Sequence, residues 1–280
     1  MTNWIEIRAE FDTAPQDWSI YADALDRFNC PGSLIEDDPA SIGGYLVEVP
    51  GADDQAKALS DELIRLGADR VVTQIVPEED WAELWKQHFK PRRIGRTMVV
   101  RPTWETYEAD PADLEIVLDP GQAFGTGDHP TTRLCLELLE AAEPAGLTLA
   151  DVGCGSGILA IAAAKMGALD IIATDLDPLS VEVTRQNMAL NGVDFVTDVA
   201  EGFVGLHGRQ SQIVISNIIS ATLIRLAPDA ARHTADGGRW IVSGIIVGNW
   251  PDVRKAAESN GFTLLEQHQE DDWVAATFRR

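Results

Sequence analysis

The chain has 280 residues, 45% of them hydrophobic and 24% charged, which is typical of a soluble globular protein of about two domains. Its 45 acidic and 22 basic residues give a net charge of −23. This charge argues against a protein that wraps nucleic acid or binds an anionic membrane, because both surfaces would repel it.

No apolar run reaches the ~18 residues of a transmembrane helix, and the polar-interrupted N-terminus does not predict a signal peptide. The three cysteines are widely spaced, so they predict neither a disulfide framework nor a metal knuckle, and the histidines lack metal-ligand spacing. We therefore expect a reduced, cytoplasmic protein without a bound metal.

The first 77 residues predict a small α+β domain. Strand-like alternation and helical spacing follow one another in the order β-α-β-β-α-β, which is the ferredoxin-like arrangement. The predicted elements are a strand at 4–9, a helix within 15–28, strands at 33–36 and 45–49 with Gly43-Gly44 between them, a helix at 53–66 ended by Gly67, and a strand at 71–76.

Residues 78–104 differ in composition and predict a connecting segment. They hold six basic and four acidic side chains, whereas the sequence on either side is strongly acidic. Trp81, Trp85 and Phe89 recur every four residues, which predicts a short helix with an aromatic face. That face either docks on a neighbouring core or forms part of a surface for a partner. We expect domains at 1–77 and 105–280.

The second domain predicts a doubly wound α/β sheet. Short apolar strands alternate with helices, as in a parallel sheet covered on both faces. The last two strands are separated only by a short acidic turn, so they must be antiparallel. Strands are predicted at 147–152, 170–174, 212–216, 239–243, 263–267 and 273–278, and helices at 133–140, 158–166, 178–190, around Leu223 and Leu226, and at 251–259.

A glycine-rich turn follows the first of these strands and opens a helix. Its sequence is Asp-Val-Gly-Cys-Gly-Ser-Gly at 151–157. Gly153 and Gly155 would let the backbone approach a ligand at the helix N-terminus, although a tight turn without a ligand is the alternative. The spacing is not the G-x-G-x-x-G of a pyrophosphate loop, and no Walker lysine follows it.

Asp175 ends the next strand, where an acid can accept both hydroxyls of a ribose. NAD and S-adenosylmethionine both carry this ribose, but the loop spacing and the terminal hairpin favour S-adenosylmethionine. We interpret Asp177 as the N-cap of the following helix, because Pro178 comes next.

Asn217 ends a further strand and is expected to face the ligand crevice of an open α/β sheet. Enzymes that methylate adenine N6 carry Pro-Pro-aromatic after this position. Here Ile218-Ile219-Ser220 follows, which argues against that reaction.

The Gly-, Thr- and His-rich stretch 119–132 precedes the sheet and leads into a helix. One interpretation is a lid over the crevice, in which Phe124 covers the cofactor and Thr132 contacts it. The alternative is an ordinary capped loop in which His129 packs.

Three segments together resemble the ribosomal protein L11 methyltransferase (PrmA) family, over essentially the whole chain. They are residues 119–132, which resemble D-P-G-x-A-F-G-T-G-x-H-x-T-T, residues 151–162, which resemble D-V-G-C-G-S-G-I-L-A-I-A, and Glu79-Asp80-Trp81 with Trp85. The resemblance implies a class I, Rossmann-like methyltransferase with a substrate-recognising N-terminal domain. It implies S-adenosylmethionine contacts at Thr132, Gly153, Asp175 and Asn217. Asp128 and the stretch 216–220 depart from the usual family pattern.

The expected reaction is methyl transfer to amino groups of that basic ribosomal protein, by a monomer acting on neither membrane nor nucleic acid. We expect Asn217 to orient the amine and no strong base to be needed, with His129 the titratable alternative. Other possibilities are a class I methyltransferase for another protein or a small molecule, an NAD-dependent oxidoreductase, or a silent S-adenosylmethionine-binding protein. The acidic charge either steers a basic substrate or serves solubility.

Overall fold

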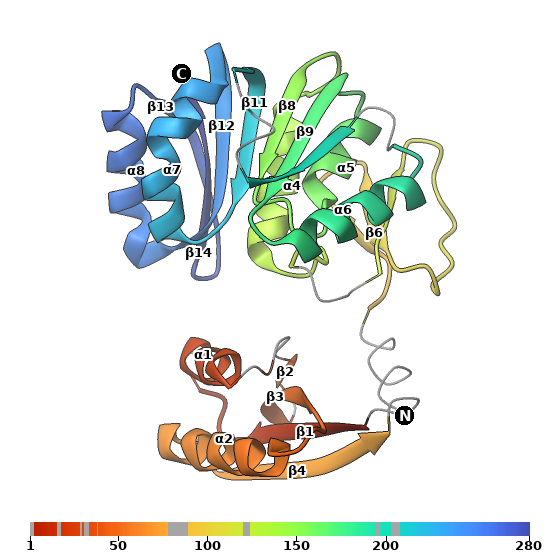
Figure 1. Ribbon diagram of the computed structural model, residues 1–280, viewed down its shortest axis with the longest axis vertical. Coiled ribbons are helices and arrows are strands. Elements are labelled where there is room, and N and C mark those ends of the chain that lie inside the picture. The colour runs from red at the N-terminus through yellow and green to blue at the C-terminus, as the bar shows by residue number, and fades with distance from the viewer. Residues whose placement is uncertain are drawn as a thin grey trace. The chain divides into compact units, whose positions relative to one another are not determined.

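The computed structural model describes residues 3–15, 18–28, 30, 34–37, 39–77, 89–119, 124–193, 197–202 and 208–280. The chain divides into two compact units, Met1–His88 and Phe89–Arg280 (Figure 1). Residues 89–104, predicted to connect two domains, therefore group with the second unit, while Trp81 and Trp85 lie outside the described residues. No helix in these described ranges is long and apolar enough to cross a bilayer.

The first unit has the predicted element order and sheet. The antiparallel strand order is β2-β3-β1-β4, which is that of a ferredoxin-like fold. Gly67 adopts the left-handed conformation that ends the second helix, as predicted. The elements are β1 (Asn3–Glu10), α1 (Ser19–Arg27), β2 (Leu34–Asp37), β3 (Ala40–Val47), α2 (Ala52–Leu66) and β4 (Arg70–Pro77).

The prediction of a strand at 45–49 is wrong in its bounds, because β3 begins at Ala40 and runs through both glycines. The sequence suggested that Gly43-Gly44 precede the strand. Instead they pair with β1, and a Cβ added to Gly44 would lie 2.7 Å from the Sγ of Cys30. The glycine thus serves close packing of the strand against the end of α1, not a turn.

The second unit contains a seven-stranded sheet of order β10-β9-β8-β11-β12-β14-β13. The first five strands are parallel, and β14 lies antiparallel between β12 and β13. This confirms the doubly wound sheet with an antiparallel terminal hairpin. Its strands are β8 (Thr148–Val152), β9 (Asp170–Asp175), β10 (Thr197–Glu201), β11 (Ser211–Asn217), β12 (Thr234–Ile246), β13 (Thr263–Glu270) and β14 (Trp273–Arg279).

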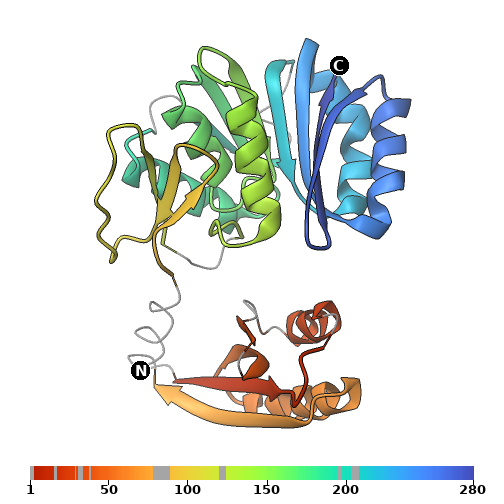
Figure 2. The same cartoon turned by 180° about the vertical axis from the view of Figure 1, so that it is seen from behind.

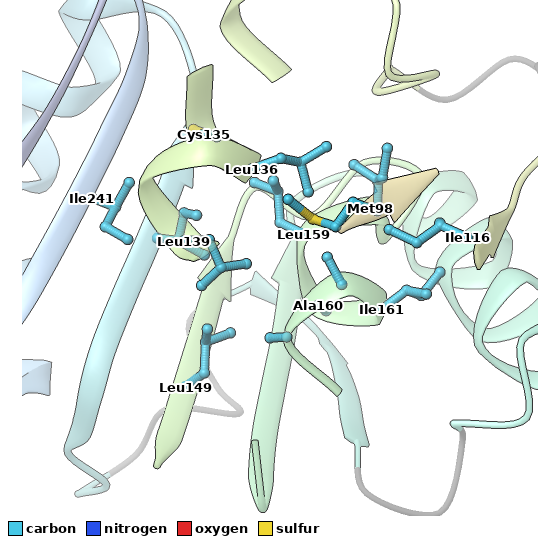
Figure 3. Packing of buried hydrophobic residues seen from close by; sticks show 14 of the residues in the cluster. Met98, Ile116, Cys135, Leu136, Leu139, Leu149, Leu159, Ala160, Ile161 and Ile241 are labelled. Atoms are coloured by element: carbon cyan, nitrogen blue, oxygen red, sulfur yellow. The ribbon is translucent and has the colours of Figure 1, made fainter. Parts of the chain in front are cut away.

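Helices cover both faces of this sheet (Figures 1 and 2). One hydrophobic cluster lies under the helices α4, α5 and α6, and a second lies under α7 and α8. Figure 3 shows the first cluster, in which Leu136 and Leu139 of α4 gather with Leu159 of α5 and Met98. The helices are α4 (Pro130–Ala141), α5 (Ile158–Lys165), α6 (Pro178–Leu190), α7 (Ser220–His233) and α8 (Trp250–Ser259), with a short 3-10 helix at Val247–Asn249.

A three-stranded sheet, which the sequence did not predict, lies within residues 92–117. It consists of β5 (Arg92–Ile94), β6 (Met98–Arg101) and β7 (Leu114–Val117). Met98 and Ile116 are fully buried and join the same cluster as α4 and α5. These strands are too short and too charged to show hydrophobic alternation in the sequence, so their packing in the structure is what identifies them.

The buried carboxylate of Glu140 fixes this small sheet to α4. Its Oε2 accepts from the backbone N–H of Arg96 at 2.9 Å, and its Oε1 accepts from the N–H and hydroxyl of Thr97 at 3.0 and 2.6 Å. A Cβ on Gly95 would lie 2.7 Å from Oε2, so the turn closes tightly around the carboxylate. Burial alone would raise the pKa of Glu140, but the hydrogen bonds from Thr97 and Arg96 together lower it.

Replacing Glu140 by Gln should lower the free energy of unfolding by about 2–3 kcal/mol at neutral pH, because two backbone donors lose a charged acceptor. A carboxylate whose pKa is lowered in the folded state stabilises the folded protein fully at pH values above its ordinary pKa of about 4.3. This stabilisation is lost as the pH falls through the lowered pKa. Urea unfolding at several pH values measures the difference between wild type and variant. Glu137→Gln, on the same helix but half-exposed, should change stability by less than about 0.5 kcal/mol. An equal loss in both variants would contradict this role of Glu140.

Candidate active site

The carboxyl ends of three neighbouring parallel strands bring the predicted site residues to one edge of the sheet. Gly153 follows β8, Asp175 ends β9 and Asn217 ends β11. Since β8 lies between β9 and β11, Asp175 and Asn217 are about two strand spacings apart, roughly 10 Å. They do not form one polar cluster; they stand on either side of the glycine loop, so a ligand that reaches both must be elongated.

The glycine loop is a tight, left-handed turn. Gly153, Gly155 and Gly157 have φ of +83°, +53° and +83°, which L side chains rarely adopt. A Cβ on Gly155 would lie 2.5 Å from the carbonyl oxygen of Phe124, and this oxygen also accepts from the N–H of Ser156 at 2.9 Å. Position 155 therefore requires glycine, because another backbone segment lies against it.

Asp175 is held by two backbone donors. Its Oδ2 accepts from the N–H of Gly155 at 2.9 Å, and its Oδ1 accepts from the N–H of Asp177 at 3.0 Å. Each oxygen keeps a second lone pair for a hydroxyl donor. Asp177 caps α6, as predicted, because its Oδ1 accepts from the N–H of Leu179 at 3.0 Å.

Asn217 contacts the first turn of α4. Its Nδ2 donates to the hydroxyl of the fully buried Thr132 at 3.3 Å, whereas its Oδ1 is buried and has no hydrogen-bond partner in the described part of the chain. An unpaired buried amide oxygen is destabilising by about 1–3 kcal/mol. The oxygen at the end of β11 is therefore a ready acceptor for a donor from a ligand.

Asp151 is a buried group of this site that the sequence analysis did not single out. The side chain is fully buried, Oδ2 accepts from the N–H of Ala160 in the first turn of α5 at 3.2 Å, and Oδ1 lacks a partner among the described residues. Burial raises the pKa of Asp151 to about 7, with a smaller contribution from Asp175. One signal could have found it, namely a single acid inside the apolar run 149–152.

The loop before α4 lies against the glycine loop. The hydroxyl of Ser156 donates to the carbonyl of Gly125 at 2.6 Å, while the Phe124 side chain remains 58% exposed. Pro120 to Ala123 of the predicted lid lie outside the described residues.

His129 is the N-cap of α4, which begins at Pro130 and not at the predicted 133, so that Thr132 falls in its first turn. The Nδ1 of His129 accepts from the N–H of Thr131 at 3.3 Å and lies 2.8 Å from the Thr131 hydroxyl. Burial lowers the pKa of His129, and Arg133 lowers it further, while Glu270 opposes the change. A capping role for this histidine agrees with the capped-loop interpretation.

Replacing Gly155 by Ala should destabilise the protein by roughly 3 kcal/mol or more, because a positive φ and a clash with a backbone oxygen act together. Gly192 has a similar φ of +66° but nothing within 4 Å of its added Cβ, so Gly192→Ala is the matched control. That control should lose only about 1 kcal/mol. Thermal unfolding of both variants measures the difference, and equal losses would show that the Phe124 contact has no effect.

Comparisons with known proteins identify the family of this chain. The family described as ribosomal protein L11 methyltransferase (PrmA) matches residues 16–280. The ribosomal protein L11 methyltransferase of Geobacter metallireducens is 50% identical over 204 residues, 72% of this chain and 67% of that protein. The one from Pelotomaculum thermopropionicum is 40% identical over 275 residues, 95% and 85% of the two chains.

A solved structure, the ribosomal protein L11 methylase of Lactobacillus delbrueckii subsp. bulgaricus, is 34% identical with a TM-score of 0.62. The match covers 69% of this chain and 99% of that one. With a family match over 265 residues and relatives at these identities, the chain belongs to the ribosomal protein L11 methyltransferase (PrmA) family.

Proposed function

We propose that this protein transfers methyl groups from S-adenosylmethionine to amino groups of ribosomal protein L11. Family membership supports the reaction and the substrate. One observation carries the chemistry: the buried Oδ1 of Asn217 has no partner in the described ranges and lies at the strand end next to the glycine loop. A carbonyl oxygen there can accept an N–H from an incoming amine.

The residues present fit S-adenosylmethionine. The Asp175 carboxylate is fixed by backbone donors and keeps lone pairs for the two ribose hydroxyls, while Gly153 and Gly155 allow close backbone approach. The exposed side chain of Leu176, next to Asp175, offers an apolar surface for the adenine ring of the cofactor. Thr132 and Phe124 complete the proposed set. The cofactor supplies a methyl group on a sulfonium, whose carbon–sulfur bond breaks as the amine nitrogen bonds to the methyl carbon.

Asn217 is proposed to orient the acceptor amine. The Asn217 Nδ2 donates to the Thr132 hydroxyl, which fixes the direction of the Asn217 Oδ1. An amine that donates to Oδ1 then has its lone pair directed away from that oxygen. Holding two reacting atoms in this way is worth up to ~7–11 kcal/mol of the barrier. A side chain that orients the amine needs no charge, and the amide of Asn217 is uncharged.

The amine must be neutral, and we propose that desolvation achieves this without a dedicated base. A free lysine with a pKa of about 10.4 is only roughly 0.1% neutral near pH 7.4, and burial beside a cation lowers that pKa. His129 is poorly suited as the base because its Nδ1 accepts from Thr131, which leaves the ring proton on Nε2.

We propose that the acceptors are lysine side chains and the N-terminal amine, and that the first unit recognises the substrate. A strongly acidic chain would attract a basic ribosomal protein by long-range steering, an effect that salt weakens. We also propose that the protein acts as a monomer in the cytoplasm and has no nucleic-acid substrate of its own.

The direct test combines calorimetry with S-adenosylmethionine and mass spectrometry of purified L11 after incubation with enzyme and cofactor. We expect cofactor binding and mass increases in steps of one methyl group. Asp175→Asn should weaken cofactor affinity by about tenfold or more, because the amide cannot accept both ribose hydroxyls. Cofactor binding without any methylation of L11 would contradict the proposed substrate.

Asn217→Ala should lower kcat by about 100-fold, because a misplaced acceptor amine reacts that much more slowly. Asn260→Ala, at the end of α8, removes an amide that donates to the carbonyl of Ala256 and should leave kcat within about twofold. Single-turnover methylation at saturating cofactor measures both. Unchanged kcat in Asn217→Ala would exclude the orienting role.

A further inference from the structure

Three aromatic rings, two from the loop before α4 and one from the start of β14, meet beside the site. The ring centroids of His129 and Trp273 are 4.8 Å apart with an interplanar angle of 72°, and those of His129 and Phe124 are 5.6 Å apart at 62°. We call these three residues the aromatic corner. In such edge-to-face pairs the edge of one ring meets the face of the other, while Phe124 stays 58% exposed and His129 and Trp273 are only partly buried.

The aromatic corner is continuous with the site already described. The backbone carbonyl of Phe124 accepts a hydrogen bond from the glycine loop, and His129 caps the helix whose first turn carries Thr132. Trp273 comes from the start of β14 and pairs with Ile246 of β12, whose side chain is 45% exposed. An aliphatic chain approaching Asn217 would therefore find apolar surface beside the rings.

Ionic contacts join the segments that carry the corner, and Arg133 beside it is paired. The guanidinium of Arg133 donates to the carboxylate of Glu270 on β13 and to the carbonyl of Asp128, so it joins the β13–β14 hairpin to the loop before α4. Burial and the nearby Arg133 lower the pKa of His129, which disfavours the protonated ring. A cation that enters the corner thus meets the aromatic rings beside the Arg133–Glu270 ion pair.

We propose that the aromatic corner binds the methylated ammonium of a partly modified amine and retains it between successive transfers. Each transfer leaves a cationic nitrogen with more methyl groups, which is larger and more weakly hydrated than before. Aromatic faces attract such cations, most strongly those of tryptophan. The corner would then set how many methyl groups an amine receives. This inference rests on the proposed function.

The test compares Trp273→Leu, which keeps an apolar side chain but removes the π face, with Trp273→Phe, which keeps a weaker face. Full-length wild type and both variants are incubated with L11 and cofactor, and mono-, di- and trimethylated products are counted by mass spectrometry over time. We expect Trp273→Leu to slow the second and third additions about tenfold relative to the first, and Trp273→Phe to recover most of that loss. Cofactor affinity and thermal unfolding are measured on each variant to detect misfolding.

A binding experiment gives a readout that does not depend on turnover. Calorimetry compares the affinities of the full chain for two peptides in the presence of S-adenosylhomocysteine. One peptide carries a trimethylammonium group on a lysine side chain, and the other carries the neutral tert-butyl isostere of that group. We expect wild type to prefer the cationic peptide by about five- to tenfold, and Trp273→Leu to lose that preference.

The outcomes separate the two proposals. Failure of wild type to methylate L11 at all would overturn the proposed function. Normal methylation by wild type, with the same product ratios in Trp273→Leu and equal binding of both peptides, would overturn the role of the aromatic corner alone. If Trp273→Leu unfolds, the two peptides with wild type still decide the question.

Discussion

The second unit depends on one close approach, that of the Phe124 carbonyl to the backbone at Gly155 and Ser156. Only a glycine with positive φ fits under that oxygen, so the loop must turn sharply where β8 ends. This turn places the Gly155 N–H on the carboxylate of Asp175 and starts α5 over the sheet. The same contact holds the chain that leads to His129, the cap of α4. The glycines thus determine the positions of two helices and an acid together.

The strand ends also collect polar groups that are not satisfied. Asp151 Oδ1 and Asn217 Oδ1 are both buried without partners among the described residues, and each is expected to be unfavourable by about 1–3 kcal/mol. Elsewhere in the unit a buried carboxylate such as Glu140 has several donors. The contrast with Glu140 supports the proposal that a ligand donates to the buried oxygen of Asn217.

The sequence predicts the parts of this structure whose cause is local. The helix at 178–190, the cap at Asp177, the ferredoxin-like order and the antiparallel hairpin follow from caps, periodicity and connection length. The three-stranded sheet at 92–117 and the run of β3 through Gly43 and Gly44 do not, because packing against α4 and Cys30 determines them. At the site, the strand ends could be predicted, but the contact of Thr132 with Asn217 and the meeting of His129 with Trp273 join residues more than 80 positions apart.

Negative charge has opposite effects on the binding of a basic substrate and on the reactivity of its amine. Carboxylates attract a basic substrate, yet a carboxylate beside the acceptor would keep its nitrogen protonated and unreactive. Three acids near the strand ends of the second unit have partners or a raised pKa: Asp175 accepts two backbone donors, burial raises the pKa of Asp151 to about 7, and Glu270 pairs with Arg133. The group proposed to meet the amine is an uncharged amide. The long-range charge can therefore favour association while the site favours the neutral, reactive form of the amine.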